Sequence, residues 1–414
     1  MYSYRFKAEP TPTQEDWAAR SAGSNRWVYN EARKFCIQEY AKGNKYPGYP
    51  ALCKKLTEWR SERSWLREGV CDAQQQALVD LDSAFQRFFK KLGKFPAKKS
   101  RKRSAPSMRF PQGSKIELTK LSKKDSVLKL PKLGQLRFRQ SQPVLGTIRS
   151  VNLKRDSTRE WHVVVLTDRV KRLPAATAEQ VGKAVGIDMG VKTSATLSNG
   201  TSFHVPVPSN RDEKHLARLQ RRVARRKNGS RRCNKARLAV AKFHKRWQNR
   251  RNDILHKQST RITLENQEVY VEALQVRNMT RKCRGKGRAA KAGLNKSILQ
   301  QGWGMFHEML EYKAARREGN VFGKENPAYS SQKCRKCGHT EADNRLTQAV
   351  FCCLKCNHTE NADANASINI LVAGQATTAR GRSVRRVVES TSVRSRLAGR
   401  LKREPVGSAC ASST

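Results

Sequence analysis

Long apolar runs and acidic residues are what this 414-residue sequence has least of. Because a membrane helix needs roughly 18 or more apolar residues in a row, and no such run occurs, we expect no membrane span. Asp and Glu number 34 against 85 Lys and Arg, which gives a net charge of +51. A chain this cationic repels itself unless a polyanion neutralises it. No helix sets a wide aromatic and leucine face opposite a basic one, so nucleic acid, not a membrane surface, is the expected partner.

Features that accompany disulfide bonds are also missing. Eleven cysteines are an odd number, and no apolar leader segment follows Met1. Five of the cysteines are scattered along the chain, at Cys36, Cys53, Cys71, Cys233 and Cys283. This usage favours a reducing cytosol over an oxidising compartment.

Four other cysteines have the spacing of a metal centre. Cys334 and Cys337 form one C-x2-C pair, and Cys353 and Cys356 form a second. Two such pairs close a tetrahedron of sulfur around one structural zinc ion, the arrangement of a zinc ribbon. Buried free thiols are the alternative, which two correctly spaced pairs make less favoured. Cys352 adjoins Cys353, but a pair needs two intervening residues, which favours Cys353 as the ligand.

The first half of the chain alternates between two periodicities. Residues 2–8 have the period of a strand, and helices are predicted from Thr13, with Asp16 completing a capping box, and over 72–92. Gln74, Gln75, Gln76 and Arg87 on the second helix are able to hydrogen-bond base edges. Five short strands are then predicted at 116–118, 126–130, 136–139, 147–153 and 161–167. With residues 2–8 they are expected to form one small β-barrel into which the helices are inserted.

Positive charge is concentrated in two segments. Residues 90–103 hold eight Lys or Arg and no acidic residue, which is consistent with a solvated loop or with phosphate contact. Residues 211–262 hold nineteen Lys or Arg against three acidic residues, with Asn228-Gly229 between two predicted helices. A solvated helical hairpin is the plain interpretation, but this charge density favours a surface that follows a nucleic-acid backbone.

Three carboxylates occupy comparable positions. Asp188 ends an apolar strand at a glycine turn, Glu272 ends a second apolar strand, and Asp363 begins an Ala- and Ile-rich helix directly after the cysteines. Any one of them could simply cap a turn. Together, three carboxylates of this kind are able to hold two Mg²⁺ (or Mn²⁺) ions about 3.5–4 Å apart for hydrolysis of a phosphodiester.

The remaining segments are assigned more simply. A hairpin on an Asn199-Gly200 turn follows Asp188. Residues 277–296 are predicted to be a mobile loop, 294–317 a helix and 320–324 a strand. The tail from Gly374 holds nine Lys or Arg and two acidic residues, and it is expected to be disordered on its own. RNA contact and a dispensable extension are both consistent with that tail.

These motifs resemble the TnpB family, the transposon-encoded OrfB proteins with a zinc ribbon, which are related to compact type V CRISPR effectors. The resemblance is carried by motifs in order along the chain: Gly186-Ile-Asp188-Met-Gly190, Val271-Glu272-Ala-Leu274, the two cysteine pairs, and Asp363-Ala-Asn365 through Ile370. Tyr4-Arg-Phe6 and Arg26-Trp-Val-Tyr29-Asn30 match as well. Almost everything before the tail is therefore covered.

The resemblance implies a mixed α+β fold in several domains. It implies a wedge β-barrel (1–11 and 105–180), a helical recognition lobe (12–104), a RuvC-like nuclease of RNase H fold (181–330 and 358–373), a zinc ribbon (331–357) and the tail (374–414). Asp188, Glu272 and Asp363 fall on the family's catalytic positions. Ala273 and Ala362 depart from its pattern, which commonly has an acidic or amide residue after the glutamate and an arginine before the aspartate. Neither departure removes a metal ligand.

The resemblance also implies a function and partners. It implies a Mg²⁺-dependent, RNA-guided DNA endonuclease of a transposable element in the cytoplasm and nucleoid of a bacterium or archaeon, one protein per guide RNA. Gln75, Gln76 and Lys94 fall where the family reads a short adjacent motif in duplex DNA. Arg221, Arg222, Arg225 and Arg226 are the expected phosphate contacts of the basic hairpin.

Other functions share parts of this pattern. A nuclease-inactive RNA-guided regulator would not need all three carboxylates, and a DNA-strand-transferring transposase would not need a zinc ribbon just before Asp363. A separate zinc-ribbon DNA-binding factor would not need the strands that end at Asp188 and Glu272. The intact set of residues favours the nuclease.

Overall fold

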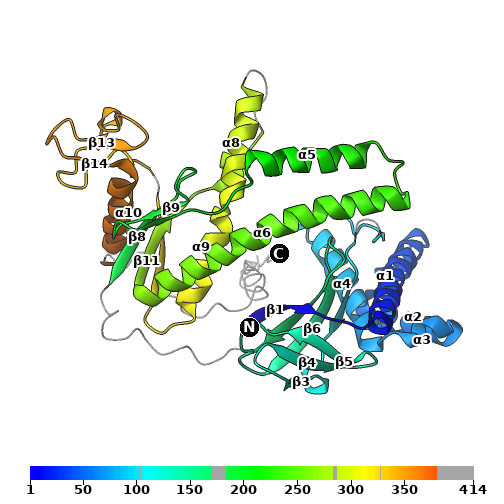
Figure 1. Cartoon of the computed structure of the whole chain (residues 1–414). Helices are drawn as coiled ribbons and strands as arrows, with labels where there is room; N and C mark the ends of the chain where they lie inside the picture. Colours follow the sequence, from blue (N-terminus) through cyan, green and yellow to red (C-terminus); the bar gives the residue numbers. More distant parts are fainter. Residues whose placement is uncertain (102–103, 169–182, 283–286, 327, 380–414) are drawn as a thin grey trace, which may run out of the picture. The chain divides into compact units, whose positions relative to one another are not determined.

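The computed structural model of the chain describes residues 1–101, 104–168, 183–282, 287–326 and 328–379 (Figure 1). The chain divides into two compact units, Met1–Val170 and Lys171–Thr414. Both combine helices with a sheet, so the mixed α/β class predicted from the sequence is confirmed. None of the helices in the described residues has the length and hydropathy that a membrane span requires.

The first unit contains a seven-stranded antiparallel sheet in the order β2-β6-β7-β1-β5-β4-β3. Its strands are β1 (Tyr2–Ala8), β2 (Ser107–Phe110), β3 (Glu117–Lys120), β4 (Asp125–Leu130), β5 (Gly134–Arg139), β6 (Ile148–Arg155) and β7 (Trp161–Thr167). The predicted strands 2–8 and 161–167 agree with β1 and β7 at both ends, because alternate side chains along each are buried in one core. Only β2, a strand of four residues, was not predicted.

The predicted barrel takes the form of a sheet with two edges. No ladder joins β2 to β3 in the described residues, so the hydrogen bonding leaves these two strands at the ends. Phe110 on β2 and Leu128 on β4, near opposite ends of the strand order, nevertheless belong to the same apolar core. The sheet therefore curls around a shared interior.

Four helices in the described residues are inserted between β1 and β2, and the first and last of them pack against this sheet. They are α1 (Pro12–Ala41), α2 (Gly48–Glu62), α3 (Ser64–Glu68) and α4 (Cys71–Phe89). The predicted start at Thr13 was wrong: Thr11 is the N-cap, and it forms the capping box with Gln14 instead of Asp16. Pro12 explains the earlier start, because its fixed φ and missing N–H suit the first helical position. The sequence did not indicate α2 and α3.

The second unit contains a five-stranded sheet in the order β10-β9-β8-β11-β12. Its strands are β8 (Ala184–Asp188), β9 (Ala195–Leu197), β10 (Ser202–Phe203), β11 (Glu268–Glu272) and β12 (Val321–Glu325). β8, β11 and β12 are parallel, and β9 and β10 are antiparallel neighbours on one side. Gly200, at φ +82°, makes the predicted tight turn between β9 and β10.

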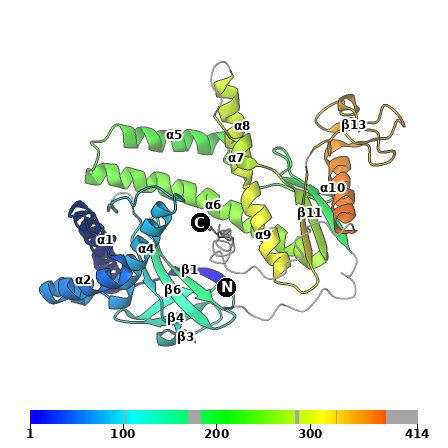
Figure 2. The ribbon, with the colours of Figure 1, turned by 180° about the vertical axis from the view of Figure 1, so that it is seen from behind.

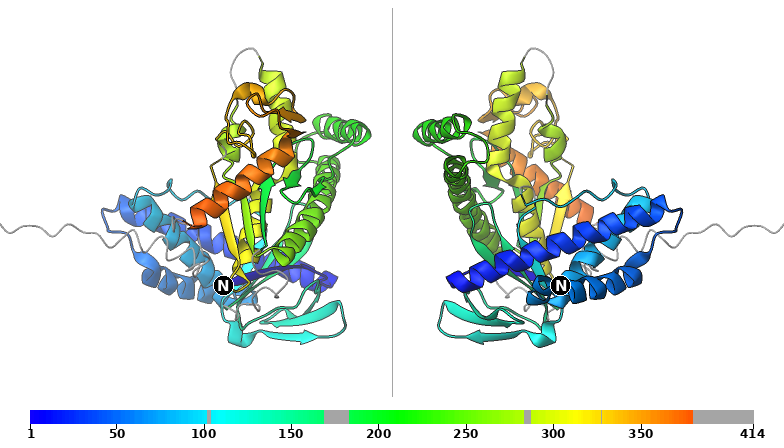
Figure 3. Two further views of the ribbon diagram at one scale, coloured as in Figure 1. Left: turned by 90° about the vertical axis from the view of Figure 1, so that its left-hand side faces the viewer. Right: turned by 90° about the vertical axis from the view of Figure 1, so that its right-hand side faces the viewer.

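Two groups of helices cover this sheet. A hairpin of α5 (Asn210–Ala224) and α6 (Arg231–Glu265) leads into β11, and α8 (Arg288–Gln301) and α9 (Trp303–Ala315) lead into β12 (Figure 2). Leu255 of α6 and Phe306 of α9 share a core with Val185 of β8. The last helix, α10 (Ala362–Ala379), crosses the sheet on the face opposite that core (Figure 3).

Three predictions for this unit were wrong. The segment predicted as a mobile loop, 277–296, contains most of α7 (Val276–Met279) and the first turns of α8, and residues 283–286 lie outside the described set. The predicted helix 294–317 is two helices separated at Gly302, which has a φ of +74°. α10 continues to Ala379, past the predicted start of the tail, and residues 380–414 lie outside the described set.

The module between β12 and α10 has little regular structure. It contains the two-stranded sheet of β13 (Val350–Cys352) and β14 (Thr359–Asn361) and the short 3-10 helix η2 (Ala342–Asn344). Its core consists of Cys334, Phe351, Cys353 and Ala362. So small a core needs another source of stability, and the cysteine cluster is in the right place to supply it.

Candidate active site and nucleic-acid interface

Two neighbouring parallel strands bring Asp188 and Glu272 together. β8 and β11 pair in parallel with Ile187 opposite Val271, so the next residue on each strand is a carboxylate. Glu272 is only 7% exposed, and its Oε1 accepts a hydrogen bond of 2.8 Å from the Ser330 hydroxyl. The two acidic side chains therefore leave the same edge of the sheet, at the carboxyl ends of its parallel strands.

Helix α10 brings Asp363 to the same edge, and it is able to pack on β8 because Gly186 of that strand has no side chain. A Cβ on Gly186 would lie 2.1 Å from the Ser367 carbonyl oxygen, so only glycine lets α10 pack directly on β8. Asn361 caps the helix by accepting hydrogen bonds from the N–H groups of Asp363 and Ala364. Asp363 is thus fixed in the first turn, close to the end of β8.

Electrostatic interactions show that the three carboxylates share one site. Burial, Glu272 and Asp363 raise the pKa of Asp188 to about 7. Burial also raises the pKa of Glu272, against the opposing effect of its hydrogen bond from Ser330. Burial is the larger cause of both raised pKa values, and repulsion from the other two carboxylates adds to it at Asp188, so the site excludes much of the solvent and concentrates negative charge.

Arg345, which sequence reasoning did not identify, is a cation that lies beside this cluster and acts on all three of its carboxylates. Its Nη2 lies 3.5 Å from Asp363 Oδ1 and donates a 2.9 Å hydrogen bond to the Gln348 carbonyl oxygen. Its charge lowers the pKa of both Asp188 and Glu272 and so opposes their repulsion. Arg345 belongs to the cysteine module, and no periodicity or spacing in the sequence links it to the two strands.

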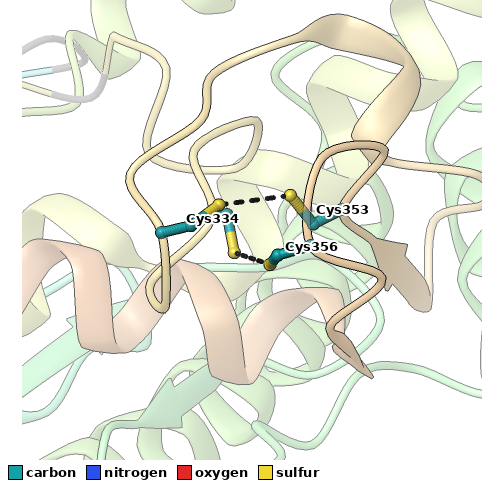
Figure 4. A group of neighbouring side chains, drawn as sticks. Cys334, Cys353 and Cys356 are labelled. Carbon is teal, nitrogen blue, oxygen red and sulfur yellow. Dashed lines mark hydrogen bonds between the residues drawn. The ribbon is translucent and has the colours of Figure 1, made fainter.

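The four predicted cysteines do gather at one point. The sulfur atoms of Cys334, Cys337, Cys353 and Cys356 all lie within 4.8 Å of one another. Cys334 faces Cys356 at 3.7 Å, and Cys337 faces Cys353 at 3.5 Å (Figure 4). Cys352 is not in the group, which confirms the choice of Cys353 over its neighbour.

The two cysteine pairs have the same local geometry. In the first, the Gly338 N–H donates to the Cys334 carbonyl, and Gly338 has a φ of +76°. In the second, the Asn357 N–H donates to the Cys353 carbonyl, and Asn357 has a φ of +53°. The left-handed residue turns each chain back, so that both sulfurs of a pair point inward. Four thiolates so arranged fit a tetrahedral zinc ribbon.

Two asparagine side chains tie the cysteine module to α10. Asn365 of α10 accepts from the Arg335 N–H at 3.1 Å and donates to the Lys333 carbonyl at 2.8 Å. Asn369, one turn on, donates to the same carbonyl. The first cysteine pair and Asp363 are therefore held by one helix turn.

Asp156, Glu160 and His162 form another group of side chains with metal-ligand atoms within 4.8 Å of one another. They lie around the turn from β6 to β7. Asp156 accepts hydrogen bonds from the N–H groups of Thr158 and Glu160 and lies 3.0 Å from His162 Nε2. Glu160 pairs with Lys7. These bonds account for the group as a brace of the hairpin.

A polar groove of about 440 Å³ lies between the helices and the sheet of the first unit. Predicted Gln76 lines it, with several cationic or amide side chains that were not predicted: Asn25, Arg26, Lys99, Arg109, Asn152 and Lys154. Burial lowers the pKa of Lys99. Arg109 Nε is buried without a hydrogen-bond partner, which is costly unless a ligand supplies one. The groove therefore suits an anionic ligand with base-edge acceptors.

The other predicted contacts of the first unit have different surroundings. Gln75 is partly exposed and does not line the groove, and Lys94 is exposed beyond the end of α4. The prediction for Gln74 was wrong: it is fully buried, where it donates to the Leu66 carbonyl at 2.9 Å and to the Ser24 hydroxyl at 3.3 Å. It packs the helices together and is not available to a base.

The predicted arginines of the basic hairpin are all exposed. Arg221 and Arg222 are in the last turn of α5, and Arg225 and Arg226 begin the connection to α6. Leu219 of α5 and Phe243 of α6 are buried, and the two helices pack against each other along this narrow apolar stripe. Its cations are presented to solvent on a rigid support.

Three family models match successive parts of the chain. One described as "Probable transposase" (OrfB, IS605) matches residues 162–282, one described as "Cas12f1-like, TNB domain" matches 303–370, and one described as "Helix-turn-helix domain" matches 1–45. Residues 1–45 contain β1 and one unbroken helix, α1. Between them the models match parts of both units and the cysteine module.

Two relatives match this chain over nearly its whole length and over nearly all of their own. InsQ of Escherichia coli (strain K12), a "putative RNA-guided DNA endonuclease", is 36% identical over 93% of this chain and 95% of its own length. A protein of the same description from Streptomyces pristinaespiralis is 34% identical over 94% of this chain and 93% of its own. The solved Cas12f1–sgRNA–target DNA complex aligns with 89% of this chain and 98% of that chain at 15% identity, and its TM-score of 0.29 is too low to show a common fold.

Fold and site define a two-unit cationic α/β protein in which a four-cysteine module adjoins a buried carboxylate cluster. The matches over nearly the full length identify it further. The chain belongs to the OrfB family of IS605 transposons, the TnpB family.

Proposed function

We propose that this protein is an RNA-guided DNA endonuclease of a transposable element. It binds a guide RNA made from the transposon end, recognises a short motif in duplex DNA and cleaves the adjacent guide-matched sequence. The observation that carries the proposal is the convergence of Asp188, Glu272 and Asp363 from two strands and a helix. Homology to proteins described as RNA-guided DNA endonucleases supports it.

The second unit is the proposed nuclease, of RuvC-like RNase H fold. Its support is the strand arrangement, in which an antiparallel β8-β9-β10 meander is extended by two strands parallel to β8. The first unit would comprise the wedge sheet and the helical recognition lobe. In this proposal each of the two units would form part of the nucleic-acid interface.

The donor set of the carboxylate cluster fits divalent magnesium. All three ligands are hard oxygen donors, and the raised pKa of Asp188 marks a site with excess negative charge. The ligand atoms of the three carboxylates do not all lie within 4.8 Å of one another, so they would enclose a larger volume than the cysteine sulfurs do. Bound Mg²⁺ or Mn²⁺ would supply an activated water and stabilisation of the leaving oxygen.

The protein's own residues orient that chemistry. Asp188, between the other two carboxylates, would ligate in its deprotonated form, and Ser330 fixes the rotamer of Glu272. Arg345 is placed beside Asp363 where the charge of a phosphodiester would arrive. A guanidinium there would bind a phosphate oxygen and draw the backbone into the cluster.

The four cysteines would hold one structural zinc ion. Its role in the proposal is to fold the module that carries Arg345 and that anchors the first turn of α10. Because the core of the module is so small, the ion would supply much of its folding free energy.

Specificity in this proposal is divided between base pairing and protein. Pairing with the guide reads the target, and the groove that Gln76 lines reads the adjacent motif. The exposed arginines of the α5–α6 hairpin contact RNA phosphates, with Gln75 and Lys94 at the margin of the DNA-binding surface. We place the complex in the bacterial cytoplasm, at the nucleoid, with one protein per RNA and without a membrane partner.

The test is plasmid cleavage by the full chain with its co-purified RNA. Asp188→Ala should lower the cleavage rate by orders of magnitude while target binding, measured on filters, survives. Glu272→Ala and Asp363→Ala should behave alike, and the triple variant should be little worse than one change, because the three act as a unit. Glu308→Ala, which removes an exposed carboxylate from α9, is the matched control. Undiminished cutting by Asp188→Ala would refute the site, and cutting that ignores the guide sequence would refute guidance.

A further inference from the structure

A large apolar pocket lies in the helical part of the first unit, outside the groove and the carboxylate cluster. Its volume is about 860 Å³, and it is lined by the C-terminal ends of α1 and α4 and by the loops that follow them. Pockets of about 300–1,000 Å³ are the size that holds compact organic ligands. Nothing in the proposed cleavage reaction uses it.

Five aromatic rings meet at this pocket. Tyr46 lies 5.0 Å from Phe85 and 5.4 Å from Phe89, measured between ring centroids. Phe95 meets Phe85 at 5.6 Å and Phe88 at 5.2 Å, both edge to face. Phe85 is buried and contacts both Phe89 and Phe95, so these two outer rings pack against an inner one, while Tyr40 lines the same pocket as a sixth ring.

The outer rings are open to solvent. Tyr40 is 82% exposed, Phe89 51% and Phe95 44%, and all three line the pocket. Single exposed apolar residues need no explanation, but a contiguous group around a cavity marks a binding surface. Ring faces that project from a rigid base are suited to stacking with a planar ligand.

The surroundings of the rings are cationic. Lys45 lines the pocket, and Lys90, Lys91 and Lys94 are exposed in the segment that joins Phe89 to Phe95. The nearby carboxylates are engaged: Glu39 pairs with Lys42 and accepts from Asn44, and Asp82 accepts from the Tyr46 hydroxyl. The surface therefore offers π faces together with net positive charge.

We propose that this aromatic pocket, formed by Tyr40, Tyr46, Phe85, Phe88, Phe89 and Phe95, stacks unpaired bases of the guide RNA. Aromatic faces combined with lysines are the pattern of single-strand nucleic-acid binding, since bases stack and phosphates pair with the cations. An apolar protein partner would not need the lysines. RNA is the occupant because its loops and bulges expose unstacked bases, whereas duplex DNA exposes its bases only after opening. The inference rests on the proposed function for the identity of the RNA.

The test measures binding of single-stranded oligouridine by the full chain. Tyr40→Ala with Phe89→Ala should weaken binding by about thirtyfold or more, because the loss of one stacked base weakens binding by about 5- to 150-fold. The dependence of affinity on salt should keep its slope, since no cation is removed. Phe89→Tyr should retain affinity, and photocrosslinks from thiouridine should map to the pocket.

Controls separate stacking from other effects. Trp65→Ala removes a similarly exposed ring from α3, outside the pocket, and should leave affinity unchanged. A thermal melt should show that the double variant is folded. Unchanged affinity in the folded double variant, or a dimer in the wild type that becomes a monomer in the variant, would overturn the proposal. A loss confined to oligothymidine would assign the pocket to DNA and overturn the choice of RNA.

The outcomes also distinguish the two proposals. A wild-type chain that binds no RNA contradicts the proposed function itself. RNA-guided cleavage that persists while oligouridine binding ignores Tyr40 and Phe89 contradicts only the role of the pocket.

Discussion

Asp188 titrates differently from a surface carboxyl because strand pairing holds it beside Glu272 and burial removes its water. Because burial and its neighbours raise its pKa from the ordinary value of 3.8 to about 7, the folded protein keeps a proton on Asp188 between these two pH values. The unfolded chain has already lost that proton. The contribution of Asp188 to stability is therefore complete at low pH and is lost as the pH rises toward 7. Magnesium, by favouring the charged form, would reverse this trend.

We predict that, in the presence of a chelator, the free energy of unfolding of the wild type falls between about pH 4 and pH 7. This fall should exceed the fall in Asp188→Asn by up to about 4 kcal/mol. Asparagine keeps the shape and loses the ionisation, so the variant isolates this group. Thermal or denaturant unfolding across that pH range measures the difference. Parallel curves for wild type and variant would show that neither burial nor the neighbouring carboxylates raise the pKa of Asp188.

Gln76 differs from Gln75 by one position on the same helix, yet only Gln76 lines the groove. We predict that Gln76→Ala changes the preferred motif in a library of randomised flanking sequences. The loss of one bidentate contact should cost about 1–3 kcal/mol of discrimination. Gln75→Ala is the matched control and should change preference less. An unaltered preference in Gln76→Ala would move the reading surface elsewhere.

At the scale of elements, α10 connects two parts of the second unit that the sequence presents as separate motifs. Gly186 lets the helix pack on β8, and Asn365 joins its first turn to the first cysteine pair. The position of Asp363 therefore depends on both the sheet and the cysteine module. Loss of the module should reach the carboxylate cluster through this helix.

We predict that Cys334→Ser lowers bound zinc below one equivalent and unfolds the module, since a structural zinc ion contributes on the order of 10 kcal/mol to such a fold. Cleavage should fall with it. Cys352→Ser changes the neighbouring thiol outside the cluster and should keep both metal and activity. Metal analysis and hydrogen exchange over residues 331–365 provide the measurements. Absence of zinc from the wild type would contradict the assignment.

At the scale of the whole molecule, a net charge of +51 makes salt the main determinant of nucleic-acid affinity. The exposed arginines at the end of the α5–α6 hairpin belong to that charge. Other cations of the same hairpin are already paired, Lys257 with Asp253 and Arg261 with Glu265. Position in the fold, and not charge alone, therefore decides which cations are available to phosphates.

We predict that replacing Arg221, Arg222, Arg225 and Arg226 by Gln lowers the slope of log affinity against log salt by up to about three, because each neutralised phosphate contributes about 0.7–0.9. Replacing Lys257 and Arg261 should have a smaller effect per residue. Filter binding of the co-purified RNA over a range of salt concentrations gives both slopes. Equal slopes in wild type and the four-arginine variant would make the hairpin a solvated surface.

The sequence by itself determined those features that local pattern controls. Period-two alternation predicts β1 and β7 with their observed ends, because each strand buries one side of a pleat. The two C-x2-C spacings identify the four clustered sulfurs, since each pair needs only its own turn. The ends of the strands at Asp188 and Glu272 were also predictable from local pattern, because each apolar run stops at its carboxylate.

Only the tertiary structure decided which side chains from distant segments meet. It buries Gln74 among helices, although its helix position predicted an exposed base reader. It brings Arg109 and Asn152 to the groove beside Gln76, and Arg345 to Asp363. Helix packing and sheet order fix these contacts through residues far apart in the chain, so no local period or spacing carries a signal for them.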